Sequence, residues 1–206
     1  MSRIGLLGGS FNPAHGGHRR ISLFARDALG LDEVWWLVSP GNPLKSGEGM
    51  ASLSERFASA VDRAARAPIR VTAIERELGT RYTVDTLAAL KRRYPANRFV
   101  WLMGSDNLAQ FHRWKDWRRI ARSLPFAVIA RPGYSRAALF NPAMSWLRPY
   151  RCAPGQLLDR EPPAWSWLSF DPDHRSATAI RAQDADWAAK YDARSLRDQV
   201  THRAIS

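Results

Sequence analysis

The chain alternates short apolar runs with longer stretches in which apolar residues return every three or four positions. Short apolar runs are typical of strands buried on both faces, and the three-to-four spacing is typical of amphipathic helices. The runs predict six strands, at residues 3–7, 34–38, 69–74, 98–103, 126–130 and 165–170. The spacing predicts helices at residues 17–29, 54–67 and 83–93. Helical spacing also relates four apolar residues after the fourth strand, which are Leu108, Phe111, Trp114 and Trp117.

Strands and helices that alternate along a chain with short loops form right-handed crossovers and a parallel sheet. We therefore expect an α/β fold, a doubly wound Rossmann-like parallel sheet with helices on both faces. The length of 206 residues suits a single domain over residues 1–206. Residues 135–163 lack a clear period and contain several prolines, which predicts a variable insertion with a short helix. We expect the chain to end in a C-terminal helical segment over residues 176–206.

Charge and cysteine content narrow the partners and the compartment. The formal net charge is +12, which favours anionic partners such as nucleotides, nucleic acid or an acidic surface. The basic residues are scattered along the chain, which favours solvated faces around an anion-binding site over nucleic-acid binding. The single cysteine, Cys152, excludes an intramolecular disulfide, and no apolar stretch is long enough to span a membrane. We expect a cytoplasmic protein with no membrane partner.

A glycine-rich turn follows the first predicted strand and opens the first predicted helix. Residues 8–18 read GGSFNPAHGGH. Glycines let main-chain N–H groups approach a phosphate closely, and the start of a helix adds positive potential. His15 and His18 stand three residues apart at this helix start, so both imidazoles can point to one side of the turn. Two imidazoles beside a phosphate cradle indicate chemistry on a phosphate.

Further polar candidates lie beside the ends of predicted strands and helices. Lys45 follows the second strand and is either a phosphate contact or an exposed loop lysine. Asp106 follows the fourth strand, where a carboxylate either accepts hydrogen bonds from ribose hydroxyls or caps the next helix. By residue type alone, Thr83, Ser176 and Thr178 are helix caps.

The glycine-rich turn resembles the signature of a known family, the nucleotidylyltransferases with a His-x-Gly-His motif, and among them the bacterial nicotinate-nucleotide adenylyltransferases. Ser10 and Asn12 stand where that family usually has threonine and aspartate, and both replacements keep a similar size and hydrogen-bonding ability. The loop with Lys45 matches the family in part. Later matching segments are YTVDTL at 82–87, GSDNL at 104–108 with Trp114, RPG at 131–133, and SATAIR at 176–181, where Arg175 replaces an apolar residue.

The resemblance implies adenylyl transfer from ATP to nicotinate mononucleotide in NAD biosynthesis, giving deamido-NAD and pyrophosphate, with Mg²⁺ bridging the triphosphate. It makes His15 and His18 the catalytic residues, which bind the reacting phosphates. For ATP and its phosphates, it assigns Gly8, Gly9, Ser10, Phe11, Lys45, Ser176, Thr178 and Arg181. For the mononucleotide, it assigns the main chain of Thr83 and Val84, the ribose ligand Asp106, the stacking ring of Trp114 and the main-chain N–H of Lys115. No protein residue is assigned to a metal.

Three other functions stay open from the sequence. A pantetheine-phosphate or glycerol-phosphate nucleotidylyltransferase shares the opening motif, but is not expected to carry the YTVDT segment and the Asp106–Trp114 pair. A class I aminoacyl-tRNA synthetase needs a later Lys-Met-Ser-Lys-Ser-like loop and a larger chain. A basic RNA-binding module accounts for the charge, but the sequence has no recognisable RNA-binding signature. The adenylyltransferase is therefore favoured, and the oligomeric state stays open, a homo-oligomer included.

Overall fold

The computed structural model describes residues 1–41, 49–131, 133, 138–170, 177–191 and 196–205. At its centre is a six-stranded sheet in the order β3-β2-β1-β4-β5-β6, and every neighbouring pair of strands is parallel. The strands are β1 (Arg3–Gly9), β2 (Glu33–Val38), β3 (Ile69–Thr72), β4 (Arg98–Gly104), β5 (Phe126–Ile129) and β6 (Trp165–Leu168). All six strands predicted from the apolar runs are present.

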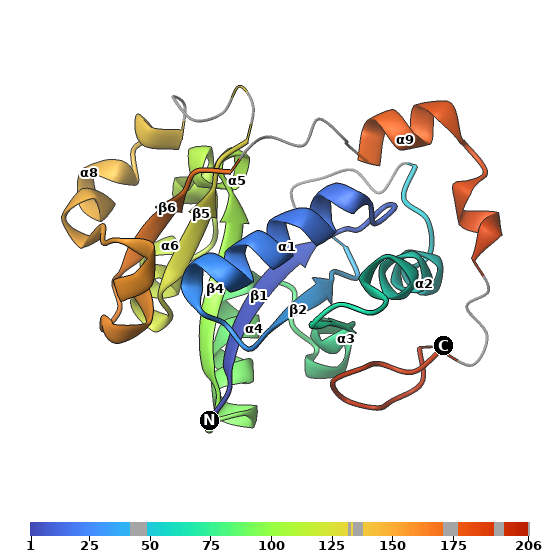
Figure 1. The fold of residues 1–206 in the computed structure, drawn as a ribbon, viewed down its shortest axis with the longest axis horizontal. Coiled ribbons are helices and arrows are strands. Elements are labelled where there is room, and N and C mark those ends of the chain that lie inside the picture. The colour runs from blue at the N-terminus through green and yellow to red at the C-terminus, as the bar shows by residue number, and fades with distance from the viewer. Residues whose placement is uncertain (42–48, 132, 134–137, 171–176, 192–195, 206) are drawn as a thin grey trace.

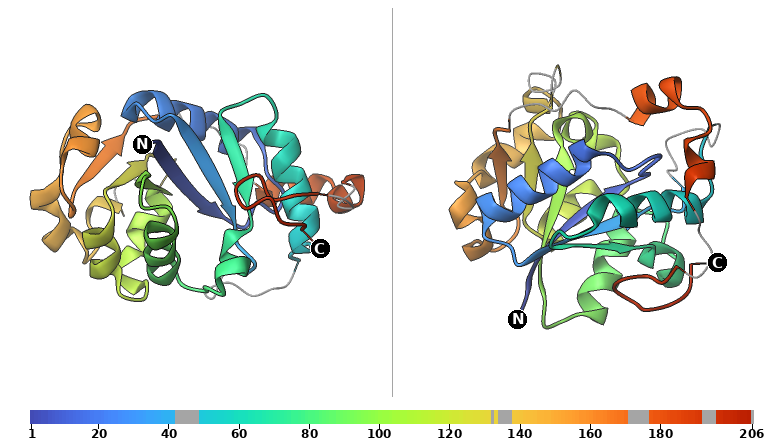
Figure 2. Two further views of the ribbon diagram at one scale, coloured as in Figure 1. Left: turned by 90° about the horizontal axis from the view of Figure 1, so that it is seen from below. Right: turned by 45° about the vertical axis from the view of Figure 1, so that its right-hand side comes forward.

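Helices cover both faces of this sheet (Figure 1, Figure 2). One face packs against α1 (Gly16–Leu29) and α2 (Leu53–Ala64), and the other against α4 (Thr83–Arg93), α6 (Trp117–Ser123) and α8 (Met144–Leu147). The shorter elements are α3 (Ile74–Leu78), α5 (Ser105–Ala109), η1 (Phe111–Arg113), η2 (Arg148–Tyr150), η3 (Pro154–Asp159), α9 (Ala177–Gln183) and η4 (Trp187–Lys190). The predicted doubly wound α/β fold is confirmed.

The neighbouring tryptophans of β2 show how the two faces form. Successive side chains of a strand point to opposite faces, so Trp35 and Trp36 enter different layers. Trp36 packs with Phe57 of α2, and its indole N–H donates to the hydroxyl of Ser22 in α1 at 2.7 Å. Trp35 packs in the opposite layer, with Leu87 of α4. Both tryptophans are buried, one in each layer of the core.

The helix predicted between β4 and β5 is broken into three short pieces. α5 ends at Ala109, η1 follows, and α6 begins only at Trp117. Asp116 has a φ of 49°, a left-handed conformation that interrupts a right-handed helix. Trp114 therefore lies in extended backbone between the helices, with a ψ of 143°.

The C-terminal segment differs most from the prediction. After α9 and η4, residues 196–205 form a loop that is not helical, closed by an antiparallel bridge between Arg197 and Ala204. The loop lies along the outer edge of β3. There the main-chain N–H of Val71 donates to Gln199 Oε1 at 2.7 Å, and the N–H of Gln199 donates to the carbonyl of Val71 at 3.1 Å. These bonds satisfy edge groups that would otherwise be unpaired.

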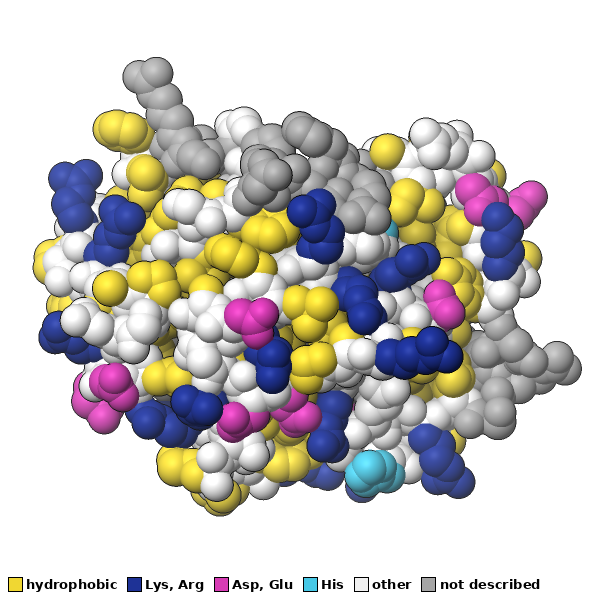
Figure 3. All heavy atoms as spheres, in the orientation of Figure 1, with side chains coloured by type: hydrophobic (Ala, Val, Ile, Leu, Met, Phe, Trp, Pro, Cys, Tyr) yellow, Lys and Arg dark blue, Asp and Glu magenta, His cyan; other side chains and the backbone are white. Residues whose placement is uncertain are grey.

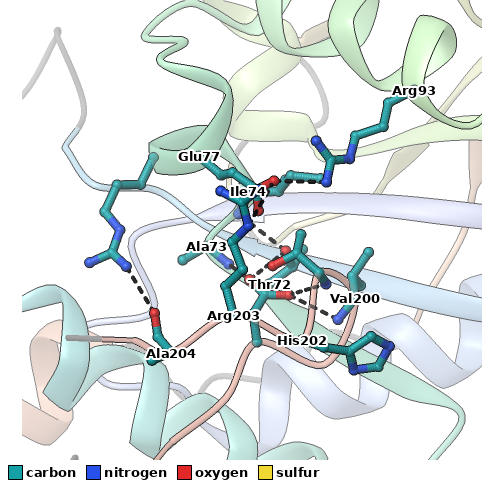
Figure 4. A network of polar contacts seen from close by, with 12 residues as sticks. Thr72, Ala73, Ile74, Glu77, Arg93, Val200, His202, Arg203 and Ala204 are labelled. Carbon is teal, nitrogen blue, oxygen red and sulfur yellow. Dashed lines mark hydrogen bonds and ion pairs between the residues drawn. The ribbon is translucent and has the colours of Figure 1, made fainter.

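Asp198 holds this loop in place. Its buried carboxylate accepts hydrogen bonds from the Thr72 hydroxyl (2.9 Å), the Ala73 N–H (2.7 Å) and the Val200 N–H (2.8 Å). Figure 4 shows Thr72, Ala73 and Val200 meeting in this network. Because the network captures the end of β3, the strand stops at Thr72 and Ile74 begins α3, where an extended strand to residue 74 was predicted.

In the part of the chain that the structure describes, no helix combines the length and the apolar character needed to cross a bilayer.

Candidate active site

The carboxyl ends of β1 and β4 lie side by side at the centre of the sheet, where the strand order reverses. In open α/β sheets, ligands bind in the crevice outside such a reversal. β1 leads into the glycine-rich turn and α1, and β4 leads into α5 (Figure 1). The segments predicted to bind phosphate and ribose therefore begin at the same edge of the sheet.

Close packing favours glycine at position 8 and leaves little room for a side chain at position 9. A Cβ on Gly8 would lie 2.7 Å from Cη2 of Trp101, and a Cβ on Gly9 would lie 3.3 Å from the ring of Phe11. Phe11 itself has a φ of 47° and is 1% exposed. Its side chain is thus part of the core, and it can reach a phosphate only through its main chain. The N–H of Phe11 has no acceptor among the described residues.

His15 and His18 form a reciprocal cap at the start of α1. The N–H of Gly17 donates to Nδ1 of His15, and the N–H of His15 donates to Nδ1 of His18, both at 3.2 Å. The ring centroids are 3.9 Å apart, so the structure brings the two predicted catalytic imidazoles together. Because each Nδ1 accepts a main-chain hydrogen, each neutral ring carries its own hydrogen on Nε2.

The electrostatic environment keeps His18 neutral. Burial lowers the pKa of its imidazole well below the usual value, and the nearby charges of His15 and Arg131 lower it further. The ring packs on Phe11, with centroids 4.8 Å apart, which holds it against the glycine-rich turn. At neutral pH, His18 is therefore a neutral hydrogen-bond donor at Nε2.

Asp106 lies at the predicted place, just after β4. Its Oδ1 is 3.5 Å from Nε of Arg131, and this oxygen has no hydrogen-bond donor among the described residues. The N–H of Arg131 donates to the hydroxyl of Ser105 at 2.9 Å. A Cβ on Gly104 would lie 2.2 Å from Oδ1 of Asp106, so the carboxylate folds closely over the strand end. It can accept hydrogen bonds from a ligand.

The start of α4 presents two unpaired amides. Tyr82 is the N-cap residue, so Thr83 is the first helical residue and does not cap the helix with its side chain. The N–H groups of Thr83 and Val84 have no acceptor among the described residues, as is usual for a first helical turn. The segment therefore offers main-chain donors, and the cap expected from the residue type of Thr83 is wrong.

The loop after η1 lies beside this helix start. Nζ of Lys115 is 3.3 Å from Oδ2 of Asp85 and 4.5 Å from the centroid of the Tyr82 ring. The N–H of Lys115 also has no acceptor among the described residues. Trp114 packs edge-on against Phe111, with centroids 5.5 Å apart, and stays partly exposed. The contacts of the Lys115 side chain with Tyr82 and Asp85 thus hold this loop beside the start of α4, where Thr83 and Val84 lie.

α9 meets the glycine-rich turn through Arg181. One guanidinium nitrogen donates to the carbonyl of Asn12 at 2.5 Å, and the other lies 3.4 Å from the hydroxyl of Thr178. Two predicted phosphate ligands, Lys45 and Ser176, lie outside the described residues. Arg181 and Thr178 therefore connect to the site, and the other two stay predictions.

Two arginines at this site were not among the predicted site residues. Arg131, which lies in the family-like RPG segment, is 3.5 Å from Asp106, and its positive charge helps to lower the pKa of His18. Arg56 is buried and donates to the carbonyl of Ser10, inside the glycine-rich turn, at 2.7 Å. The sequence offers one signal for Arg56: it stands beside Phe57, on a helix side whose other residues are apolar or small. The described residues contain no group of three His, Cys, Asp or Glu side chains able to hold a metal ion.

Comparison with known proteins gives a consistent result. The family model described as cytidylyltransferase-like matches residues 6–183. A probable nicotinate-nucleotide adenylyltransferase of Erythrobacter litoralis is 65% identical over 206 residues, which cover 98% of this chain and 94% of that protein. The protein of the same name from Bradyrhizobium sp. (strain ORS 278) is 52% identical over 188 residues, 90% of this chain and 98% of that one.

Solved structures agree on the fold. The Plasmodium falciparum nicotinic acid mononucleotide adenylyltransferase complexed with NaAD has a TM-score of 0.67 and 16% identity, over 93% of this chain and 90% of that one. The same enzyme complexed with APC has a TM-score of 0.65 and 14% identity, over 88% and 83%. From the sequence relatives and the family model together, the chain belongs to the cytidylyltransferase-like family and, within it, to the nicotinate-nucleotide adenylyltransferases.

Proposed function

We infer that this protein transfers the adenylyl group of ATP to nicotinate mononucleotide, with deamido-NAD and pyrophosphate as products. The observation that carries this proposal is the imidazole pair at the start of α1. His15 and His18 lie with ring centroids 3.9 Å apart, beside a turn whose Phe11 N–H has no acceptor among the described residues. Both relatives described above carry the name of this activity.

The reaction needs no covalent intermediate with the protein. A phosphate oxygen of the mononucleotide attacks the α-phosphorus of ATP, and the bond from that phosphorus to the oxygen of the β-phosphate breaks. The electron pair of that bond leaves with pyrophosphate. Such transfers depend on positioning and on stabilising negative charge on the phosphate oxygens.

The two imidazoles suit this role because their hydrogen atoms are fixed. Each Nδ1 is held by a main-chain N–H, which puts the hydrogen on Nε2. We assign the Nε2–H groups of His15 and His18 to the α-phosphate and the leaving pyrophosphate, where charge increases in the transition state. A donor already aimed at developing charge needs no reorganisation during the reaction.

We assign the nicotinate mononucleotide, which accepts the adenylyl group, to the main-chain amides around the start of α4. The N–H groups of Thr83, Val84 and Lys115 have no acceptors among the described residues, and all are donors. Donors satisfy the two oxygens of a carboxylate, whereas the NH₂ of a carboxamide would face another donor. This arrangement favours nicotinate over nicotinamide. Asp106 is assigned to ribose hydroxyls, and Trp114 to stacking on the pyridine ring.

The triphosphate is assigned to the glycine-rich turn and to α9. Gly8, Gly9, Ser10 and Phe11 offer main chain, while Thr178 and Arg181 approach from the C-terminal side. Lys45 and Ser176 stay in this set as predictions from the sequence. Mg²⁺ enters with the substrate, as the magnesium complex of ATP, and its ligands are assigned to the phosphate oxygens.

A pyrophosphate-release assay tests the proposal. Purified protein, ATP and Mg²⁺ are mixed in turn with nicotinate mononucleotide, nicotinamide mononucleotide, phosphopantetheine, glycerol phosphate and RNA. We expect fast release with nicotinate mononucleotide and much slower release with nicotinamide mononucleotide. Equal rates with both pyridine mononucleotides would contradict the acceptor assignment, and release only with another acceptor would contradict the proposed function.

The basic composition gives RNA binding no added support. On the face drawn in Figure 3, Lys and Arg side chains are interspersed with acidic and apolar ones. If the protein bound RNA with a steep dependence on salt concentration and did not turn over ATP, an RNA-binding function would be favoured instead. The cytoplasmic location and a homo-oligomer stay predictions.

A further inference from the structure

Arg56 is a buried cation at the base of the glycine-rich turn. It lies in the first turn of α2 and is 1% exposed. Burial lowers the pKa of its guanidinium. No carboxylate among the described residues lies within ion-pair distance of it, although buried charges in proteins are usually paired. Burying the charge of Arg56 without a carboxylate partner costs folding free energy, so we expect a role for this side chain at the site.

The guanidinium binds main-chain carbonyls from three segments that meet at the site. Nη1 donates to the carbonyl of Ser10 at 2.7 Å and to that of Ser39 at 2.8 Å. Nε donates to the carbonyl of Ala51 at 3.0 Å. Ser10 belongs to the turn after β1, Ser39 follows β2, and Ala51 precedes α2. A single side chain therefore ties both loops at the carboxyl edge of the sheet to the start of α2.

The bond to Ser10 also sets the direction of a donor. In a trans peptide, the C=O and the following N–H point in opposite directions. The Ser10 carbonyl points toward Arg56, so the N–H of Phe11 points away from it. That N–H has no acceptor among the described residues, and φ of 47° at Phe11 turns the chain sharply at this point. Arg56 thus fixes the orientation of the amide that the glycine-rich turn offers to an anion.

We propose that Arg56 is a positioning residue for adenylyl transfer. Its guanidinium locks the turn with the Phe11 N–H facing the triphosphate of ATP, and its positive charge is compensated by the bound phosphates. The proposal rests on the proposed function, and it concerns the nucleoside triphosphate half of the site only. Among the described residues, the Arg56 side chain bonds only to Ala51, Ser10, Ser39 and Pro40, so we expect the mononucleotide half of the site, at α4 and Lys115, to be independent of it.

The variant Arg56→Lys tests this directly. Lysine keeps the charge but has a single nitrogen, which cannot span the carbonyls that the planar guanidinium reaches. We expect kcat/KM for ATP to fall about 100-fold, the size of effect that follows a small misplacement of reacting groups. We expect the KM for nicotinate mononucleotide to stay unchanged. Arg63→Lys is the matched control, because Arg63 lies in the same helix with an exposed side chain.

A second variant keeps the test valid if lysine fits poorly. Arg56→Ala leaves a hollow of guanidinium size, and we expect free guanidinium ion at millimolar concentration to restore part of the turnover, while methylammonium does not. If Arg56→Ala does not fold, Arg56→Lys decides alone. Folded Arg56→Ala that guanidinium fails to rescue would overturn the proposal.

A purely structural role would give a different result. Arg56→Lys would then melt at a lower temperature but would keep wild-type kcat and both KM values below its melting temperature, and that outcome overturns the proposal. The thermal shift caused by a non-hydrolysable ATP analogue separates this test from the proposed function. If wild-type protein releases no pyrophosphate with any acceptor, the function is wrong, yet a smaller analogue-induced shift in Arg56→Lys than in Arg63→Lys still supports the role of Arg56 at a phosphate site.

Discussion

Two substitutions at His18 separate its structural role from its chemical role. Asparagine places Oδ1 close to where Nδ1 of histidine lies, so His18→Asn keeps an acceptor for the N–H of His15. Glutamine places its amide nitrogen close to Nε2, so His18→Gln keeps a donor toward the phosphates but loses that acceptor. His18→Gln therefore loses the 3.2 Å bond from the His15 N–H to Nδ1, and His18→Asn loses the proposed bond from Nε2–H to the phosphates.

The magnitudes expected for the two variants differ in kind. Loss of the phosphate donor in His18→Asn is expected to lower kcat by about 100- to 1,000-fold, as for loss of one donor that stabilises a developing oxyanion. Loss of the cap in His18→Gln is expected to lower the free energy of unfolding by about 0.5–1.5 kcal/mol, the net value of one hydrogen bond, with a smaller loss of kcat.

Steady-state pyrophosphate release and urea unfolding measure the two effects on the same preparations. The binding of ATP is expected to change little in His18→Asn, since the donor acts mainly in the transition state. The assignment of Nε2–H to the reacting phosphates is wrong if His18→Asn keeps wild-type turnover. It is also wrong if the loss of turnover is fully explained by a smaller fraction of folded protein.

Three further outcomes follow from particular contacts. Gly8→Ala is expected to lower the free energy of unfolding by about 1–3 kcal/mol, because its Cβ would lie 2.7 Å from the Trp101 ring. Gly155→Ala is the control, since a Cβ there would meet no other part of the described structure within 4 Å, and equal urea midpoints for the two variants would contradict the expectation. Asp198→Asn is expected to lower the free energy of unfolding by about 1–3 kcal/mol, because its NH₂ group replaces one acceptor oxygen and faces the main-chain and hydroxyl donors that this oxygen bonds; both KM values should stay unchanged in the pyrophosphate assay. Because the pKa of His18 is lowered in the folded protein, the unfolded chain binds a proton more readily as the pH falls below about 6.5, so stability should decrease there. In urea titrations from pH 7 to pH 5, His18→Gln should show a smaller decrease than the wild type, and parallel curves would refute this cause.

The sheet and the first half of the site were predictable because they depend on local patterns. The apolar runs gave all six strands, and the glycine-rich turn led directly to the His15–His18 pair. The position of Asp106 was predictable because a residue that directly follows a parallel strand lies at the carboxyl edge of the sheet; its role at the ribose stays a prediction. In each case the signal lies within about ten consecutive residues, so tertiary contacts had little to change.

The remainder depends on contacts between distant residues. Asp198 bonds to Ala73 across 125 positions, and no periodicity in residues 196–205 indicates that a loop will replace the expected helix. The broken helix before α6 depends on the left-handed backbone of Asp116, which hydrophobic spacing does not report. Arg56 was missed because a charged side chain predicts an exposed position, whereas here carbonyls 16, 17 and 46 residues away surround it.

The most direct test of the site is the pKa of His18, measured by NMR of the labelled imidazole with and without a non-hydrolysable ATP analogue. The free protein should show a value well below that of an ordinary histidine. Bound phosphates lie next to the ring in this account, and negative charge favours the imidazolium, so the pKa should rise clearly on binding. If the analogue binds, as judged by calorimetry on the same sample, but the pKa and chemical shifts of His18 stay unchanged, the triphosphate does not lie at the imidazole pair.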